Sequence, residues 1–439
     1  MNSDTGSGSD NGTGHAEGGH RWISEAAEVL VQETLAAPPG VLHCEVLVIG
    51  SGYGGAVAAA RLAGARPCSA PAGDNPKPPI RVYVLERGNE YLPGEFPATF
   101  GELPGHVRFS RGDGQPARGN ASGLFDVRLG GKVNALLGNG LGGGSLINAA
   151  VMERATQDAF AGSAWPAGID RQSLAPHYAR AEAMLGIEQI PGSVSKLDSL
   201  LAAGRQMRAR NRRKAWVAIA FNAHTRTAAN VAMHPCLQCG DCVSGCNHRA
   251  KKSLDTNYLA LARARGARLF CGATVHRIQP LPADGGYAVE FFFTDRRKAR
   301  TDNATPYVLR AQRVILAAGT LGSTEILLRS QKQGGLPVAA QALGAGFSTN
   351  GDMIAVACDQ KQEALSSALE GDAPAERHVG PTITGLLRTV PKKGERPLVI
   401  EEFAIPAPQR RLLAEVVATT DALQGLARMD FDLLSLIHI

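Results

Sequence analysis

The chain has 439 residues, of which 44% are hydrophobic and 20% are charged, and its net charge is +6. This length allows two or more domains with substantial cores. No apolar stretch reaches the ~18 residues that a membrane span needs, and the first twenty residues lack the basic start and apolar centre of a signal peptide. The mild charge, with no aromatics among the basic residues, disfavours a nucleic-acid partner. We expect a cytoplasmic protein without a transmembrane segment.

The beginning of the chain predicts little structure. Residues 1–40 are expected to be a disordered tail followed by a helix, Trp22 to Ala36, that stops at a Pro-Gly break.

The most informative motif follows an apolar run at residues 46–49. The turn Gly50-Ser51-Gly52-Tyr53-Gly54-Gly55 comes next, and an alanine-rich helix continues from it. Gly50 permits a tight turn, Gly52 lets a pyrophosphate approach the backbone, and Gly55 lets the helix pack closely on the strand. Strand, turn and helix in this order predict a dinucleotide-binding unit.

A second predicted strand, residues 81–85, ends in Glu86, whose carboxylate can accept hydrogen bonds from an adenosine ribose. Glu86 lies 36 residues after Gly50, which exceeds the usual ~20. The excess falls in residues 66–79, which contain five prolines and are expected to form a surface loop.

A second glycine cluster runs Gly138-Asn139-Gly140-Leu141-Gly142-Gly143-Gly144-Ser145-Leu146-Ile147-Asn148. One glycine-rich turn is a weak nucleotide signal, but two in this arrangement indicate a flavin enzyme. A flavin ring needs backbone N–H groups near its N1/C2=O edge, where negative charge develops on reduction. An NAD-dependent dehydrogenase is the alternative enzyme class.

Further elements are predicted from hydrophobic periodicity. We expect helices at residues 159–190 and 253–265, and strands at residues 287–293 and 313–316. In the first helix, the stripe expected to face the core is Ala175, Tyr178, Ala179, Ala181, Glu182 and Leu185. The basic residues between Arg205 and Lys214 are expected to form a solvated helix face.

From about Val46 to Ala407 the chain resembles the glucose-methanol-choline (GMC) family of FAD-dependent oxidoreductases, particularly its cholesterol oxidase-like branch. Besides the first turn, the matching segments are residues 85–88, 138–148, 164–166, 250–259, 314–323 and 347–352.

The resemblance implies an α/β fold in which a doubly wound (Rossmann-like) FAD-binding domain is interrupted by an α+β substrate domain with an antiparallel sheet. Residues 41–158 and 253–350 would form the two parts of the FAD-binding domain. Residues 159–252 would be a helical insert on the substrate side, and residues 351–433 an incomplete substrate domain.

The family's cofactor contacts can be carried over residue by residue. The residues implied to bind FAD are Gly50, Gly52, Gly55, Glu86, Gly142, Gly143, Gly144, Ser145, Asn148, Val151 and Val275, the last through its main chain to the adenine. Ala149 and Ala150 stand where the family often has glycines, which narrows the space beside the ring. The implied reaction is oxidation of the CH–OH group of a bulky hydrophobic alcohol, with a sterol as the leading class, by hydride transfer to flavin N5. Oxygen or an electron carrier would be the acceptor.

An acidic pair, Glu401 and Glu402, follows a predicted strand at residues 397–400. It matches the place where cholesterol oxidase-like members carry a glutamate that moves a proton during steroid isomerisation, and Glu402 fits better. Apolar surroundings would raise the pKa of such a carboxyl group toward the working pH. The alternative is an exposed acidic pair at a strand end. The chain has no counterpart of the family's catalytic histidine after Glu402.

Four cysteines, Cys236, Cys239, Cys242 and Cys246, have the C-x2-C-x2-C-x3-C spacing of bacterial ferredoxin-type iron–sulfur sites. The nearby Gly240 and Gly245 favour a loop over a helix. An iron–sulfur cluster is the first reading, a reduced structural loop the second, and zinc the third. A non-catalytic flavin and iron–sulfur protein for electron transfer or redox sensing is the alternative to an enzyme.

The last six residues, 434–439, have no counterpart in the family, and translation of a common transposon-end sequencing adapter would give the same residues. We expect an artefact, without a partner element, on a C-terminally truncated chain that is inactive because it lacks the family's catalytic segment. A natural apolar tail is the alternative.

Overall fold

The computed structural model describes residues 22–38, 40–66, 78–111, 117–160, 165–281, 285–298, 305–332, 334, 336, 341–355, 378–392, 397–411 and 436–438. The tail predicted before residue 22, most of the loop predicted at 66–79, and much of the segment 351–433 lie outside these residues.

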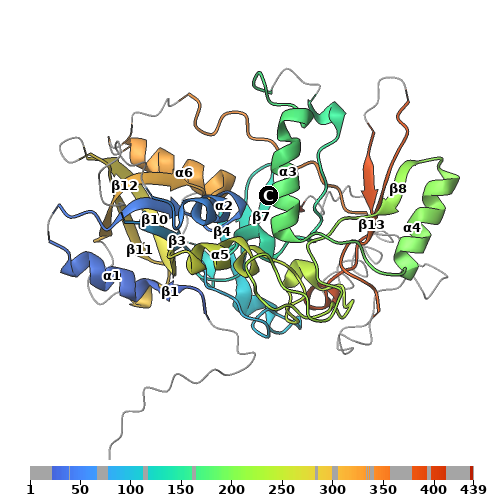
Figure 1. Ribbon diagram of the computed structural model, residues 1–439, viewed down its shortest axis with the longest axis horizontal. Coiled ribbons are helices and arrows are strands. Elements are labelled where there is room, and N and C mark those ends of the chain that lie inside the picture. Colours follow the sequence, from blue (N-terminus) through green and yellow to red (C-terminus); the bar gives the residue numbers. More distant parts are fainter. Residues whose placement is uncertain are drawn as a thin grey trace, which may run out of the picture.

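A seven-stranded sheet forms the centre of one half of the molecule, in the order β1-β9-β3-β2-β12-β11-β10 (Figure 1). The strands from β1 to β12 in this order are parallel, and β11 and β10 extend the sheet in antiparallel pairing. Numbered by chain position, β9, β3, β2 and β12 stand in the order 3-2-1-4 of doubly wound nucleotide-binding sheets. The strands are β1 (Glu25–Ala26), β2 (Cys44–Ile49), β3 (Val82–Glu86), β9 (Arg268–Cys271), β10 (Ala273–Pro280), β11 (Tyr287–Phe293) and β12 (Tyr307–Leu316).

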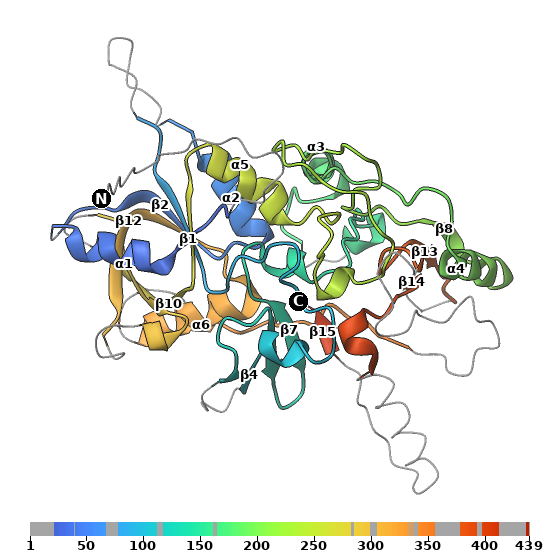
Figure 2. The same ribbon diagram turned by 90° about the horizontal axis from the view of Figure 1, so that it is seen from below.

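Helices cover both faces of this sheet because side chains of a strand alternate between its faces. Val46 and Val48 of β2 belong to a core with α2 (Tyr53–Leu62) and α5 (Tyr258–Ala264), which lie side by side (Figure 2). Leu47 and Ile49 of the same strand belong to a second core with α1 (Ala27–Ala36) and α6 (Gly319–Lys332). The predicted mixed α/β class is confirmed.

Two smaller sheets accompany the central one. The five-stranded sheet has the order β15-β7-β6-β4-β5, and the three-stranded sheet, β14-β13-β8, is antiparallel and lies at the far end of the molecule from β10 to β12 (Figure 1). Their strands are β4 (Val107–Arg111), β5 (Arg118–Gly119), β6 (Phe125–Leu129), β7 (Asn134–Gly138), β8 (Arg210–Lys214), β13 (Gly385–Arg388), β14 (Val399–Glu401) and β15 (Leu436–His438).

The remaining helical elements connect these sheets. Those whose bounds lie within the described residues are the α-helices α3 (Arg171–Leu185) and α4 (Ser195–Gln206) and the 3₁₀ turns η1 (Leu103–His106), η2 (Gly143–Leu146), η3 (Gln157–Phe160), η4 (Cys242–Ser244), η5 (Leu254–Thr256) and η6 (Arg296–Lys298). Within the ranges given above, no helix is both long and apolar enough to cross a membrane.

The helix predicted at 159–190 is shorter than expected. Asp170 caps α3 by accepting a hydrogen bond from the Ser173 amide while the Ser173 hydroxyl accepts one from the Asp170 amide, so this capping box starts the helix at Arg171. Of the predicted core-facing stripe only Leu185 is buried. The predicted stripe does face the rest of the chain, but its cover is partial: Ala175, Tyr178, Ala181 and Glu182 are half-buried, and Ala179 is exposed.

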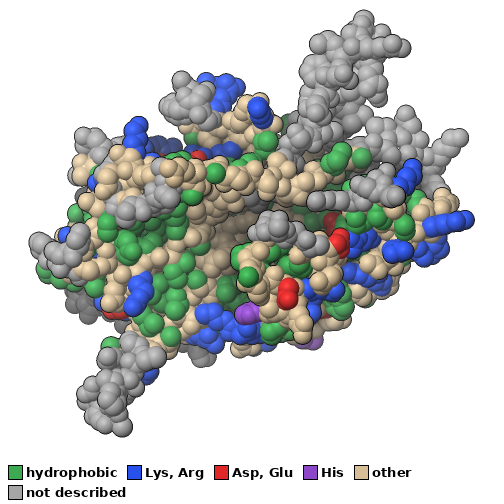
Figure 3. Space-filling view, turned by 90° about the horizontal axis from the view of Figure 1, so that it is seen from above, with side chains coloured by type: hydrophobic (Ala, Val, Ile, Leu, Met, Phe, Trp, Pro, Cys, Tyr) green, Lys and Arg blue, Asp and Glu red, His purple; other side chains and the backbone are tan. Residues whose placement is uncertain are grey.

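The basic run between Arg205 and Lys214 is solvated as predicted, but it is not one helix face. The helix α4 ends at Gln206, Arg208 and Asn211 have positive φ angles, and β8 begins at Arg210. Lys and Arg side chains gather at this end of the molecule, and the same face is hollowed near its centre (Figure 3).

The C-terminal residues have a partner strand, which differs from the expectation of an unpaired tail. Leu436–His438 pair in parallel with Asn134, Ala135 and Leu136 of β7.

Candidate cofactor site

A cavity of about 500 Å³ lies at the carboxyl ends of β2, β3 and β12, a size typical of small-molecule and cofactor pockets. Its walls come from the first glycine turn, the end of β3, β7, the second glycine cluster, the start of β10 and α6. In open α/β sheets, ligands bind at this edge, where the strand order reverses.

The first turn requires its glycines because the chain packs on itself there. Gly50 has a φ of +96°, and a Cβ added to it would lie 2.4 Å from the carbonyl oxygen of Ala317. A Cβ added to Gly55 would lie 1.9 Å from the carbonyl oxygen of Gly50. These contacts bring the first turn of α2 against β2 and β12, so both glycines serve the packing that was predicted for them.

The two glycine clusters meet at the cavity. A Cβ on Gly143, which has a φ of +55°, would lie 2.9 Å from the Cα atom of Gly52. By contrast, a Cβ on Gly52 or Gly144 would meet no atom within 4 Å, and both residues line the cavity. The missing side chains therefore leave a space that protein atoms do not fill, as a backbone approached by a phosphate requires.

The helix α2 directs its N-terminus at the same space. Its first turn has no acidic residue, and no side chain caps it at Gly52. The free backbone N–H groups and the helix dipole make this end of α2 suited to an anion.

Glu86 lies at the end of β3 and lines the cavity. Its carboxylate is buried and accepts hydrogen bonds from the backbone and hydroxyl of Ser51 and from the Gly88 amide at 2.9 Å. Ser51 Oγ also accepts a hydrogen bond from the Gly142 amide at 3.0 Å. The Ser51 hydroxyl thus ties the first turn to Glu86 and to the second glycine cluster.

Asn148 also lines the cavity, and hydrogen bonds hold both its side chain and its backbone in place. Its Nδ2 donates to Tyr53 Oη at 2.9 Å, and its carbonyl oxygen accepts from Lys251 Nζ at 2.6 Å. Ala150, where the family often has glycine, has a φ of +61°. A left-handed conformation favours glycine, so the alanine here is strained as well as bulkier.

Val275 lines the cavity from β10, next to an irregular point in the sheet. Val275 pairs with Phe291 and Arg277 pairs with Glu290, so the intervening His276 forms a β-bulge. A bulge leaves part of the ladder unpaired and re-aims the strand. The main chain beside Val275 therefore borders the cavity, and its contact with the adenine stays a prediction.

Most of the predicted cofactor residues come together in this cavity. Those that line it are Gly50, Gly52, Glu86, Gly143, Gly144, Asn148 and Val275. Gly55 packs behind the turn, and Gly142, Ser145 and Val151 lie outside the lining. Ser145 instead holds the second cluster together, because its Oγ donates to the Gly142 carbonyl oxygen and accepts from the Leu254 amide.

Comparison with known proteins agrees with this geometry. The family model for GMC oxidoreductases matches residues 44–335, well over half of the chain. The chain belongs to the GMC oxidoreductase family. Members of this family use FAD, and the open space at Gly52 and Gly144 together with the uncapped α2 fits the pyrophosphate of that cofactor.

Among curated relatives, a cholesterol oxidase of Mycobacterium tuberculosis (strain CDC 1551 / Oshkosh) is 29% identical over an alignment of 387 residues, and the match covers 80% of this chain and 62% of that protein. A cholesterol oxidase of Acinetobacter baumannii is 28% identical over 71% of this chain and 54% of its own length. This chain therefore spans less than two thirds of the length of these relatives. A solved structure of formate oxidase matches 65% of this chain and 47% of its own chain at 14% identity, with a TM-score of 0.37.

Glu402 does not line the cavity and is not in the apolar setting that was expected. Its carboxylate accepts hydrogen bonds from Lys196 Nζ at 3.0 Å, from the Thr384 amide at 2.6 Å and from the Gly385 amide at 3.0 Å. Burial lowers the pKa of Lys196, and Glu402 opposes that shift. Glu401, by contrast, is exposed at the end of β14. The exposed acidic residue expected as the alternative is thus Glu401, whereas Glu402 is part of a largely buried ion pair.

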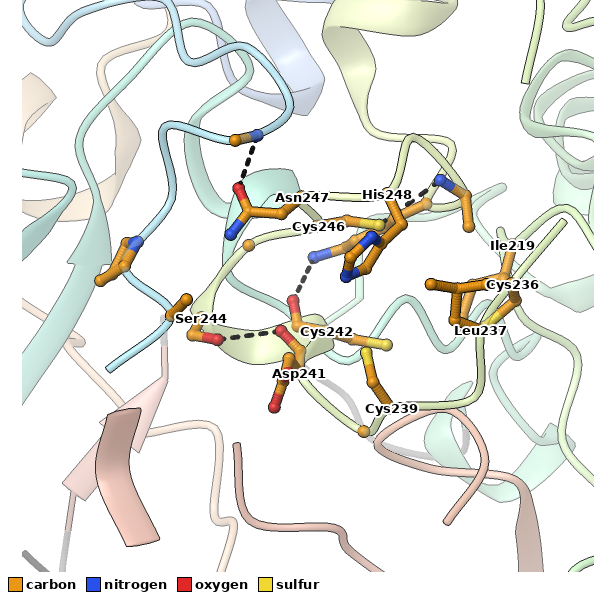
Figure 4. Close-up of a pocket in the computed structure, with 17 residues that line it drawn as sticks. Ile219, Cys236, Leu237, Cys239, Asp241, Cys242, Ser244, Cys246, Asn247 and His248 are labelled. Carbon is orange, nitrogen blue, oxygen red and sulfur yellow. Dashed lines mark hydrogen bonds between the residues drawn. The ribbon is translucent and has the colours of Figure 1, made fainter. Parts of the chain in front are cut away.

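The four cysteines line a second cavity, of about 330 Å³, together with Lys251 (Figure 4). The segment is a loop with one 3₁₀ turn, η4, as its glycines predicted. All four thiols are free. Burial, and then the neighbouring Cys242, Cys246 and Cys239, raise the pKa of Cys236, so the four sulfur atoms lie near enough to influence one another.

Sequence reasoning missed several residues of the cofactor site. Arg87, Glu325 and Arg329 line the cavity, and Ser51 orders Glu86 behind it. Arg87 could have been predicted, because it directly follows Glu86, the predicted cofactor ligand at the end of β3. Glu325 and Arg329 lie at the cavity because α6 packs against β10, and no local pattern in the sequence reveals that contact.

Proposed function

We propose that the protein binds FAD in the cavity where the two glycine clusters meet, and that it oxidises the CH–OH group of a bulky hydrophobic alcohol. The family supports the cofactor and the reaction type. Two relatives with the name cholesterol oxidase support a sterol as the leading substrate class.

The residues of the cavity have distinct roles in this proposal. The first turn of α2 and Gly52 would hold the pyrophosphate, and Glu86 would accept hydrogen bonds from the adenosine ribose. The main chain of β10 at Val275 would contact the adenine, and Asn148 would lie beside the flavin ring. When bound, FAD supplies the acceptor for a hydride from the alcohol carbon.

The observation that carries the proposal is the empty space at Gly52. A Cβ added at this position would meet no atom within 4 Å beyond its chain neighbours, and it would point into the space proposed for the ligand. A substitution at Gly52 can therefore separate loss of FAD binding from loss of folding.

The test replaces Gly52 with valine and measures FAD binding by calorimetry and by the visible flavin absorbance. We expect Gly52→Val to lose FAD binding while its unfolding curve stays close to that of the parent. Gly101→Val is the matched control, because a Cβ at Gly101 also meets nothing within 4 Å and Gly101 lies outside the cavity lining. Unchanged FAD occupancy in Gly52→Val would contradict this placement of the cofactor.

The substrate class needs a separate experiment. The FAD-loaded protein is mixed without oxygen with cholesterol in detergent or with a short-chain alcohol. We expect loss of the visible flavin absorbance with the sterol only. Bleaching by the short-chain alcohol alone would contradict the bulky substrate while leaving the cofactor site intact.

A further inference from the structure

The cysteine cavity has features that a merely structural loop does not need. Four thiols from eleven residues of sequence line one space of about 330 Å³. In two-cluster ferredoxins with this spacing the fourth cysteine binds a different cluster. Here Cys246 lines the same cavity as Cys236, Cys239 and Cys242, so all four are available to one ligand.

Backbone amides already donate to the sulfur atoms. The Gln238 amide donates to Cys236 Sγ at 3.3 Å, and the Ala250 amide donates to Cys246 Sγ at 3.4 Å. Gln238 has a φ of +59°, and the two glycines of the loop also have positive φ angles, +82° at Gly240 and +101° at Gly245. These left-handed residues curl the loop around the cavity, and N–H···S bonds of this kind tune the sulfur ligands of iron–sulfur clusters.

A four-iron cluster and a single metal ion differ in the space that they need between their ligands. Among the described residues, no group of three or more His, Cys, Asp or Glu side chains could hold a metal ion. A zinc site needs such a group, with four ligands around one centre. The ligands of a cluster each bind a different iron atom and therefore surround a larger space.

A buried cation joins this cavity to the cofactor site. Lys251 is 4% exposed, and its Nζ donates to the carbonyl oxygens of Cys242 at 2.9 Å, Leu146 at 3.0 Å and Asn148 at 2.6 Å. Cys242 belongs to the cysteine loop, whereas Leu146 and Asn148 belong to the second glycine cluster. One ammonium group thus offsets negative charge at the sulfur atoms and fixes the loop beside the flavin site.

We propose that Cys236, Cys239, Cys242 and Cys246 together bind one [4Fe–4S] cluster, and that Lys251 is a positioning residue that holds this cluster site against the second glycine cluster. The proposal rests on the cysteine cavity alone and does not depend on FAD binding or on the substrate.

The experiment uses the full chain, purified without oxygen and reconstituted with ferrous iron and sulfide. We expect about four iron and four sulfide per chain, with a visible absorbance that dithionite bleaches and an electron paramagnetic resonance signal after reduction. Cys239→Ser should lose most of the iron, while Cys271→Ser, which removes a free thiol outside the cavity, should keep it.

Two outcomes would overturn the proposal. One is a reconstituted protein without iron, and the other is retention of the full iron content in Cys239→Ser. Stoichiometric zinc in place of iron would also contradict it. FAD content is measured on the same samples, so a failure of the cluster is distinguished from a failure of the cofactor site.

The role of Lys251 has its own readout. Lys251→Met should lower the reduction potential of the cluster, because a nearby ammonium stabilises the added electron, and Lys251→Arg should restore most of the shift. An unchanged potential in Lys251→Met would contradict this role even if the cluster still assembles.

Discussion

The carboxylate of Glu402 is occupied by hydrogen bonds and an ion pair within the protein, so it serves the fold and is not available for proton transfer to a substrate. Lys196 and the amides of Thr384 and Gly385 all donate to it, and both members of the ion pair are at most 13% exposed. Removing one partner of a buried pair leaves an uncompensated charge, which is the costly event.

We therefore predict that Lys196→Met destabilises the protein by about 3 kcal/mol or more, measured by urea unfolding. Glu402→Gln should also be destabilising, and the double variant should lose less than the two single losses added together. FAD affinity should not change in any of them. Additive losses in this cycle would show that the pair is not coupled.

Asp255 predicts a pH dependence. Its Oδ1 is buried without a hydrogen-bond partner in the described structure, and burial raises the pKa of Asp255 from 3.8 to about 6. A carboxyl group whose pKa is raised by folding favours the folded state below pH 4, and this contribution disappears as the pH rises toward 6.

Asp255→Asn removes the titrating group and should be more stable than the parent at pH 7, by up to about 3 kcal/mol. The difference should vanish near pH 4. Denaturant unfolding of both proteins between pH 4 and pH 7 measures it. A constant difference across this range would mean that Asp255 does not titrate as proposed.

At the scale of elements, the contact between β2 and α2 sets the geometry of the cofactor site. Gly55 lies where a Cβ would be 1.9 Å from the Gly50 carbonyl oxygen, whereas Gly52, three residues earlier, faces open space. The same substitution should therefore have opposite consequences at the two positions.

Gly55→Ala should push α2 away from β2 and destabilise the protein by about 3 kcal/mol or more. Gly52→Ala should change the unfolding free energy by less than about 1 kcal/mol and weaken FAD binding instead. Thermal unfolding and FAD titration of both variants provide the comparison. Equal stability of the two proteins would contradict the packing of α2 that we describe.

Sequence reasoning succeeded where the requirement was local. The bounds of β11, Tyr287–Phe293, agree with the predicted strand because five of its seven residues are aromatic or β-branched. The site glycines could be predicted because a tight turn and a close approach admit few other residues. The start of α1 could not, since Glu25–Ala26 pair with β9, which lies more than two hundred residues later in the chain.

The remaining differences between the sequence predictions and the structure also arise from contacts between distant segments. The Glu402 ion pair needs Lys196 from α4, and the pairing of Leu436–His438 with β7 joins segments that are far apart in the chain. Hydrophobic periodicity carries no information on such pairs.

At the scale of the whole molecule, FAD should act as a stabilising ligand. A ligand that binds only the folded state at a hundred times its dissociation constant stabilises by about 2.7 kcal/mol. We predict that the melting temperature of the cofactor-free chain rises with FAD concentration and does not rise with NAD. Stabilisation by NAD alone would favour the dehydrogenase alternative.

The most direct test of the central claim is a crystal structure of this chain with FAD. Our account predicts the pyrophosphate at the first turn of α2 beside Gly52, the ribose at Glu86 and the flavin ring beside Asn148. FAD bound away from the junction of the two glycine clusters, or another molecule ordered in this cavity in its place, would contradict it.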